Sequence, residues 1–258
     1  MICCVAGMHR SGTSAVARWL AQGRLPLAIG GSIQPDISNP AGYYEDLDFV
    51  CLHAAHLRRR QRFSHGWRCA PRQFLHLTLA ERKQAQKLAA LRSVTHPDWG
   101  WKDPRTTLFL TEWKEIIPDL KVILPWRPCA AVVASLVARG IQQHRLHLLI
   151  DPVSAICMWQ AYNRLACDYA AQFPADTIML PVMQFDARRE SVGARLAAWS
   201  AGALFAAPEP DLQIAPHPRQ SPSSWVSLCR LMGCERLEAR LHWLSASAED
   251  SRTPGRRT

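Results

Sequence analysis

The stretch ICCVAGMHRSGTS, residues 2–14, decides how the rest of the chain is interpreted. Residues 1–6 are almost all apolar and predict a short buried strand. A loop with glycine at each end, Gly7 and Gly12, follows that strand, and a helix is expected over 13–22 because Gly23 ends the pattern. Such a unit can bind an anion, because glycine lets backbone N–H groups approach phosphate oxygens at a helix N-terminus.

The side chains of this loop also suit an anion. Arg10 supplies a permanent charge on a planar fork, and Ser11, Thr13 and Ser14 add hydroxyl donors. A nucleotide-kinase P-loop has a similar plan, but it needs lysine where Thr13 stands, and no clear strand-end aspartate for Mg²⁺ follows. A kinase or NTPase stays open as the alternative, as does an ordinary strand–turn–helix with an N-capping hydroxyl.

Predicted strands and helices alternate along most of the chain. Strands are also expected at 25–29, 99–102, 121–126 and 177–183, and helices at 44–60, 79–92, after Pro104, from Pro128 to about 139, and over 152–173. This order predicts an α/β fold, a P-loop-like three-layer sandwich with a short central parallel sheet and helices on both faces. We assign residues 1–205 to this domain. Residues 206–258 are expected to hold a loop over 208–224, a helix at 225–244 and a disordered tail from Ser245.

Basic residues occur at the ends of two further predicted strands. Lys102 ends one strand, and Arg127 follows the next. Ligands of open α/β sheets bind beyond the carboxyl ends of the strands. We therefore expect Arg10, Lys102 and Arg127 to converge, together with the positive ends of the helices that follow them, on one site for a polyanion.

Length and composition suit one globular domain. The chain has 258 residues, of which 48% are hydrophobic, and no run of 18 apolar residues could span a membrane. No basic segment with a cleavage site precedes the first predicted strand. We therefore expect a cytoplasmic protein.

The nine cysteines are scattered, and no two form a C-x-x-C pair. An odd number excludes complete pairing within the chain, and Cys3, Cys4 and Cys157 lie in apolar runs. We expect buried free thiols. No group of His and Cys residues has the sequence spacing of metal ligands, so no metal site is predicted.

The net charge is +10, part of which comes from Arg58–Arg60, Arg62 and the C-terminal tail. Such a run of charge is ordinarily a solvated face, but it also suits an anionic partner. Sequence-specific nucleic-acid binding is not expected, because the chain shows no helix-turn-helix, no zinc-finger spacing and no aromatic RNA-binding strand.

The loop RSGTS at 10–14 resembles the 5′-phosphosulfate loop of sulfotransferases, which use 3′-phosphoadenosine 5′-phosphosulfate (PAPS) as donor. The form with arginine is similar to tyrosylprotein sulfotransferases and to many bacterial members. Arg127 and Ser135, eight residues apart, are similar to the pair that holds the 3′-phosphate in this family.

Three further segments look like parts of bacterial sulfotransferase-like proteins. They are NPAGYYE at 39–45, WKDPR at 101–105 and WQAYN at 159–163. The resemblance covers roughly residues 1–186, and the C-terminal third carries no recognised motif.

The resemblance implies a role for each site residue. The donor-binding set is Arg10, Ser11, Gly12, Thr13, Ser14, Arg127 and Ser135. Lys102 is expected to contact the transferring sulfuryl group, where a cation stabilises charge on its oxygens. Glu45 resembles the family's carboxylate base in position. His53 and His9 stay as alternative bases, since other sulfotransferases use histidine.

Some nearby residues have a simpler explanation. Asp103 is expected to cap the helix that begins at Pro104. Arg105 either pairs with a carboxylate or contacts a ligand. Arg139 is expected on the surface.

The implied reaction moves a sulfuryl group from PAPS to a hydroxyl or amine, in line and without a metal ion. A catalytically silent nucleotide-binding protein of the same fold is the other alternative. The acceptor, whether small molecule, sugar or peptide, is not specified by the sequence, because acceptor pockets are built from variable loops. The basic segment 58–62 suits an acidic acceptor. The sequence does not specify an oligomeric state.

Overall fold

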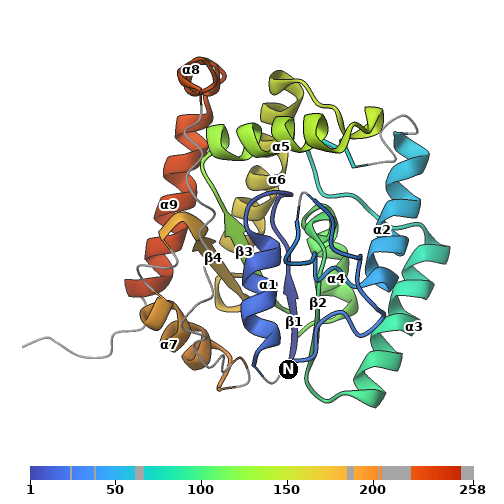
Figure 1. The fold of residues 1–258 in the computed structure, drawn as a ribbon. Coiled ribbons are helices and arrows are strands. Elements are labelled where there is room, and N and C mark those ends of the chain that lie inside the picture. The colour runs from blue at the N-terminus through green and yellow to red at the C-terminus, as the bar shows by residue number, and fades with distance from the viewer. Residues whose placement is uncertain are drawn as a thin grey trace, which may run out of the picture.

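A four-stranded parallel sheet forms the centre of the protein in the computed structural model (Figure 1). The structure describes residues 1–23, 25–37, 39–61, 67–184, 189–202, 204 and 222–250. The strands are β1 (Ile2–Val5), β2 (Trp99–Lys102), β3 (Lys121–Trp126) and β4 (Thr177–Pro181), in the spatial order β2-β1-β3-β4. Because β1 pairs with β2 on one side and β3 on the other, the loops after these three strands open at one edge of the sheet.

The helices predicted up to residue 173 are confirmed, with shifts at their ends, and the helix Arg189–Trp199 was not predicted. The described α-helices are α1 (Thr13–Ala21), α2 (Leu47–Arg60), α3 (Leu79–Thr95), α4 (Leu110–Ile116), α5 (Cys129–Gln143), α6 (Pro152–Gln172), α7 (Arg189–Trp199), α8 (Ser223–Leu231) and α9 (Cys234–Asp250). The helix expected after Asp103 begins as a 3₁₀ helix, Pro104–Phe109, and continues as α4. None of the described helices is both long and apolar enough to cross a bilayer.

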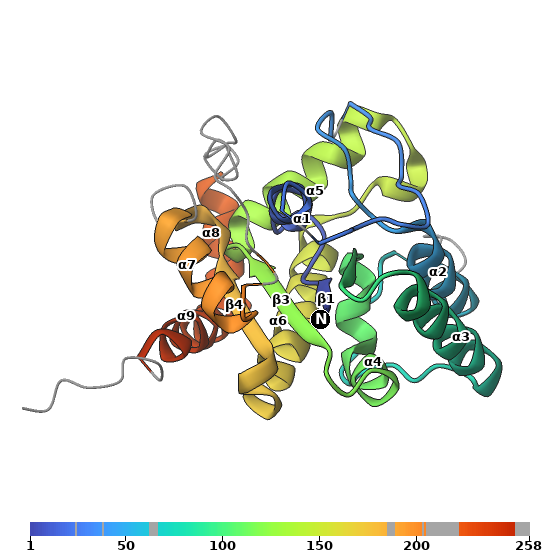
Figure 2. The same cartoon turned by 90° about the horizontal axis from the view of Figure 1, so that it is seen from below.

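Helices cover both faces of the sheet, so the predicted α/β fold class is confirmed (Figures 1 and 2). Along β1 the side chains alternate, so Val5 packs with α1 and α7 on one face, and Cys4 packs with α4, α6 and α9 on the other. β3 alternates in the same way, with Ile123 on the first face and Val122 on the second. The strands are therefore buried on both faces, as their continuous apolar runs predict.

Residues 25–29 do not form the predicted strand. Gly100 N–H donates to the carbonyl of Pro26 at 3.0 Å, which ties this segment to β2. Pro26 has no N–H with which to extend a ladder, and Ala28 is left-handed with φ 56°. The segment therefore lies beside β2 without joining the sheet.

Helix α2 starts at Leu47, three residues later than predicted. Tyr44 has a left-handed φ of 56°, which a helix does not accept. Asp46 is the N-cap, and its carboxylate accepts the N–H of Asp48 at 3.1 Å. Glu45 consequently precedes the helix and does not belong to its first turn.

The C-terminal part differs most from expectation. Two helices replace the single predicted one, because Gly233 is left-handed with φ 73° and separates α8 from α9. α9 also continues through Ser245, where a disordered tail was expected to begin. Ser245 is buried, and its hydroxyl accepts from Trp126 Nε1 at 3.0 Å. Most of the predicted loop over 208–224, and the tail from residue 251, lie outside the described residues.

One cysteine also departs from expectation. Cys157, which lies in an apolar run, is exposed, because it lies on the outer side of α6. Cys3 and Cys4 are fully buried in β1, as predicted.

Candidate functional site

The loop between β1 and α1 can be built only with glycine at both ends. Gly7 has φ 97°, and a Cβ there would lie 2.6 Å from the carbonyl oxygen of Pro125 in β3. Its N–H donates to Thr107 Oγ1 at 2.6 Å, which anchors the loop. Gly12 has φ 86°, and a Cβ there would lie 2.6 Å from a methyl group of Val182. Both positions therefore need glycine for conformation and for space.

The start of α1 offers free donors to an anion. Gly12 is its N-cap, and no side chain forms a capping hydrogen bond there. The N–H groups of the first helical turn have no acceptor within the helix, and the helix dipole adds positive potential at this end. The loop 7–12 thus presents backbone donors to the space above the sheet.

A cavity of about 1120 Å³ opens at the carboxyl ends of the strands. It is large enough for a nucleotide and part of a second substrate. The predicted site residues that line it are Arg10, Gly12, Thr13, Ser14, Glu45, Lys102, Arg127 and Ser135. Ser11 does not line it: its side chain is fully buried, and its hydroxyl has no hydrogen-bond partner. The structure therefore brings together eight of the nine residues singled out, and buries Ser11 away from the cavity.

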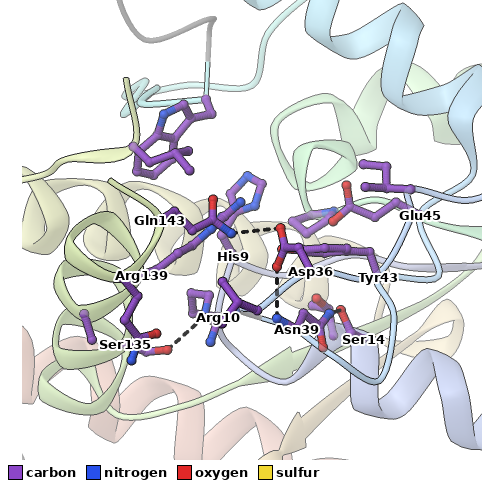
Figure 3. A pocket seen from close by; sticks show the side chains of 18 of the residues that line it. His9, Arg10, Ser14, Asp36, Asn39, Tyr43, Glu45, Ser135, Arg139 and Gln143 are labelled. Atoms are coloured by element: carbon purple, nitrogen blue, oxygen red, sulfur yellow. Dashed lines mark hydrogen bonds between the residues drawn. The ribbon is translucent and has the colours of Figure 1, made fainter. Parts of the chain in front are cut away.

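Arg10, Arg127 and Ser135 form one connected group. Arg10 Nε donates to Ser135 Oγ at 2.8 Å, and Figure 3 shows Arg10 directed toward this residue of α5. Arg127 Nη1 donates to the carbonyl of Arg10 at 3.1 Å. Arg127 is buried, its Nε has no partner, and no carboxylate among the described residues forms an ion pair with it. Burial and the nearby charge of Arg10 lower the pKa of Arg127 to about 10.

The other end of the cavity holds a buried ion-pair network around Glu45. Lys102 Nζ donates to Glu45 Oε1 at 2.8 Å and to Ser14 Oγ at 3.1 Å. Arg105 Nη1 donates to Glu45 Oε2 at 3.1 Å and to Asp103 Oδ1 at 2.7 Å. Lys102 is thus a buried cation with a carboxylate partner. Arg105 pairs with two carboxylates and also lines the cavity.

Charge and burial compete in this network. Burial opposes ionisation of Glu45, but the cations Lys102 and Arg105 outweigh it and lower the pKa of the carboxyl. Burial lowers the pKa of the Lys102 ammonium, although Glu45 acts in the opposite direction. Ser14 connects this network to the first turn of α1, so the loop and Lys102 act on the same part of the cavity.

His53 is tied into the protein and does not line the cavity. Trp113 Nε1, which can only donate, lies 2.8 Å from His53 Nε2, so His53 Nδ1 carries the proton and donates to Asp103 Oδ2 at 2.7 Å. The imidazole is fully buried, and both of its nitrogens are occupied. Asp103 in turn caps the 3₁₀ helix, since its Oδ1 accepts the N–H of Arg105 at 3.0 Å, as the sequence predicts.

His9 lines the cavity and is nearly fully buried. Its ring makes edge contacts with Trp67 and Tyr162, and its Nε2 has no hydrogen-bond partner. Burial, reinforced by the charge of Arg105, lowers the pKa of His9 to about 3. The imidazole is therefore neutral near pH 7.

A turn-rich segment, residues 34–37 and 39–43, borders the cavity opposite α5 (Figure 3). Asn39 Nδ2 donates to Ser14 Oγ at 3.3 Å and to the Gly42 carbonyl at 2.7 Å. Asp36 accepts from Gln143 of α5 at 2.8 Å and from the Tyr43 hydroxyl at 2.8 Å. Sequence reasoning missed Asp36 and Gln143, because they are 107 positions apart and belong to no motif.

The cavity wall is richer in basic residues than expected. Arg139, which was expected on the surface, lines the cavity because α5 continues past it to Gln143. Arg58 and Arg145 line it too. Of the basic segment 58–62, Arg59 instead pairs with Glu81, and Arg62 lies outside the described residues.

Comparison with solved structures identifies the fold. Sulfotransferase STF9 from Mycobacterium avium matches with a TM-score of 0.55 at 12% identity, over 92% of this chain and 76% of that one. The sulfotransferase domain of the Synechococcus PCC 7002 olefin synthase (TM-score 0.49, 15% identity, 90% and 94% covered) and STF1 from Mycobacterium tuberculosis (0.45, 14%, 93% and 75%) also match. No protein-family model and no curated protein matches the sequence. The similarity to STF9 shows that the chain has the fold of a sulfotransferase, as the resemblance in its loop implies.

Proposed function

We propose that this protein is a sulfotransferase that takes a sulfuryl group from PAPS and transfers it to a hydroxyl or amine group of an acceptor. The observation that carries the proposal is the buried guanidinium of Arg127. It has a donor nitrogen without a partner, lies against Arg10, and has no carboxylate partner among the described residues. Burying a cation without a counter-charge is costly, so such a group is expected where an anionic ligand completes the site.

The residues of the cavity divide into two anion sites that suit the two phosphate groups of PAPS. Arg127, which lies between β3 and α5, and Ser135, in the middle of α5, would hold the 3′-phosphate. The amides of the first turn of α1, with the hydroxyls of Thr13 and Ser14, would hold the 5′-phosphosulfate. Arg10 lies between them, and its flexible side chain would turn from Ser135 to the 5′ group. Ser11, whose N–H donates to the Met8 carbonyl at 3.2 Å, would help to hold the backbone of the loop.

Sulfuryl transfer requires neutralisation of charge and removal of a proton, since the donor itself supplies the activated sulfur. Lys102 would stabilise the charge on the sulfuryl oxygens, and Arg10 the charge that develops on the departing phosphate. Both are cations, so the transfer would need no metal ion.

Glu45 is the proposed base that accepts the proton of the acceptor. Held by Lys102 and Arg105, it is ionised but weakly basic. If Lys102 turns toward the sulfuryl oxygens, Glu45 loses one of its two cations, and its affinity for a proton rises. His9 is the alternative base within the cavity, and its low pKa makes it a weak one.

The acceptor would occupy the part of the cavity beyond Glu45. The cavity wall also carries Arg58, Arg139 and Arg145, which favour an acceptor that carries negative charge.

Thermal unfolding in EDTA tests the donor site. Stabilisation by 3′-phosphoadenosine 5′-phosphate without metal is expected, because ligand that binds only the folded state raises the melting temperature. Stabilisation by Mg-ATP alone would instead favour a kinase. A shift with the nucleotide but no transfer of ³⁵S to any component of a cell extract would favour a silent binding protein.

A further inference from the structure

Three cysteines from different parts of the sequence lie together where the start of α5 meets the C-terminal helices α8 and α9. Cys129 is the first residue of α5, Cys229 lies in α8, and Cys234 is the first residue of α9. Their sulfur atoms all lie within 4.8 Å of one another, and all three side chains are buried. Within the described part of the chain, no other three His, Cys, Asp or Glu side chains gather in this way.

The arrangement is close to that of a zinc site. Zn–S bonds of about 2.3 Å at tetrahedral angles place sulfur atoms about 3.8 Å apart. The observed group needs to contract by no more than about 1 Å to reach that spacing. Each sulfur comes from a different helix, so small rotations of side chains can achieve this without changes within any one helix.

A hydrogen bond with Cys234 and burial raise the pKa of Cys129, and burial raises the pKa of Cys229, so the metal ion itself would displace these thiol protons, as Zn²⁺ does when it binds. Cys129 and Cys234 are each the first residue of a helix, where the dipole and free N–H groups stabilise negative charge. Gln160 Nε2 lies 3.6 Å from Cys234 Sγ and donates toward it, as a group beside a metal-bound sulfur does.

A fourth ligand would come from Glu238 after a change of its rotamer, since its carboxylate does not belong to the compact group of three sulfur atoms. Glu238 lies one turn after Cys234 in α9, and its Oε1 accepts the N–H of Cys129 at 2.7 Å. Its carboxylate is therefore held at the same helix end as the thiol group. Three thiolates and one carboxylate make four protein ligands, the number that a structural zinc site has.

We propose that Cys129, Cys229 and Cys234 bind one Zn²⁺ ion, with Glu238 as the fourth ligand. Binding forms three Zn–S bonds and one Zn–O bond and releases the three thiol protons to solvent, with no change of oxidation state. The ion fastens α8 and α9 to α5, and so holds the C-terminal helices to the sheet domain. None of these four residues lines the cavity, so the ion takes no direct part in the transfer reaction.

The experiment uses the full chain, purified under reducing conditions without chelator. We expect about one zinc per chain by elemental analysis. Replacement with Co²⁺ should produce the intense near-ultraviolet thiolate bands and the visible bands of a tetrahedral site. In C229S and in C234S the zinc content should fall at least tenfold, whereas C51S and C157S, which alter the two exposed cysteines, should keep it. E238Q should retain the thiolate bands with altered visible bands.

If a cysteine variant does not fold, the wild type alone must show whether the site binds metal. Folded wild type is therefore also titrated with Co²⁺ and probed by alkylation, where bound metal should protect Cys129, Cys229 and Cys234 and no other cysteine. Wild type without zinc that also binds no Co²⁺ would overturn the proposal. So would a disulfide between any two of the three, or zinc content unchanged in a folded C229S protein.

Discussion

Lys102 Nζ lies 2.8 Å from Glu45 Oε1 in a site that is almost closed to solvent. The two residues are 57 positions apart, and Lys102 also reaches Ser14 of α1. The group proposed to stabilise the sulfuryl oxygens therefore also holds the group proposed to accept the proton. This coupling makes the base the first feature to test.

Glu45→Gln should retain donor binding but lower turnover by about 10²-fold or more, the usual scale for loss of a general base. The reason is that the amide oxygen can accept from only one of Lys102 and Arg105, its NH₂ group cannot accept at all, and neither atom is basic enough to take the proton. Isothermal calorimetry with 3′-phosphoadenosine 5′-phosphate and ³⁵S transfer measure the two effects. Glu115→Gln, which alters an exposed carboxylate paired with Arg82, serves as control. Normal turnover in Glu45→Gln together with an inactive, folded His9→Ala would move the role of base to His9. His53→Ala should cost less than Glu45→Gln.

Arg10→Ala should cost about 3 kcal/mol of transition-state stabilisation, which is about 10²-fold in kcat/KM. Arg10 carries the charge of the loop and contacts both Ser135 and, through its carbonyl, Arg127. Steady-state kinetics over a range of PAPS concentrations gives the value. Arg72→Ala, which removes an exposed arginine outside the cavity, should leave it unchanged. Unchanged affinity and rate in Arg10→Ala would contradict the assignment of the loop.

Arg127→Ala should remove discrimination by the 3′-phosphate. The wild type is expected to bind 3′-phosphoadenosine 5′-phosphate much more tightly than adenosine 5′-phosphate, because the buried Arg127 guanidinium, which has no carboxylate partner in the described part of the chain, gains a charge-assisted bond. Calorimetry with both nucleotides in both proteins measures the difference. If the wild type binds the two nucleotides equally, the 3′ site is wrong.

His9 should make the fold less stable in acid. Its pKa is about 3 in the folded protein and about 6.5 in an unfolded chain. Below pH ~6.5 the unfolded state gains a proton that the folded state does not, so the contribution of neutral His9 is complete above that pH and is lost as the pH falls toward 3. Urea unfolding between pH 7 and 4 should show a smaller fall in the free energy of unfolding for His9→Gln than for the wild type. His96→Gln, outside the cavity, should follow the wild type.

Gly12→Ala should destabilise the protein more than Gly202→Ala. Both glycines have φ near 85°, at 86° and 84°, so both substitutions meet the same backbone strain. Only at Gly12 would the new methyl group also lie 2.6 Å from Val182, since no described residue lies within 4 Å of a Cβ at Gly202. Equal losses of stability would show that the contact with Val182 relaxes without cost.

Local patterns sufficed where local forces decide the structure. The bounds of β2 and β3 were predicted to the residue. The apolar run of β2 ends at the charged Lys102, and that of β3 ends before the turn that contains Pro128. The Asp103–Pro104 start and the Thr78 start of α3 were also predicted, since capping is a contact between neighbours in sequence. The strand expected at 25–29 does not form despite its apolar pattern, because Pro26 has no N–H to donate and Ala28 has a left-handed φ of 56°.

By itself, then, the sequence determined the parallel sheet, the glycine-ended loop and the basic residues at three strand ends, because each depends on periodicity or on residues next to one another. The tertiary structure alone decided which groups meet: that Lys102 and Arg105 share Glu45, that His53 is enclosed by Trp113 and Asp103, and that Cys129 lies with Cys229 and Cys234. Those pairs are separated by tens of residues, and their distances are set by how helices pack on the sheet, which no local pattern encodes.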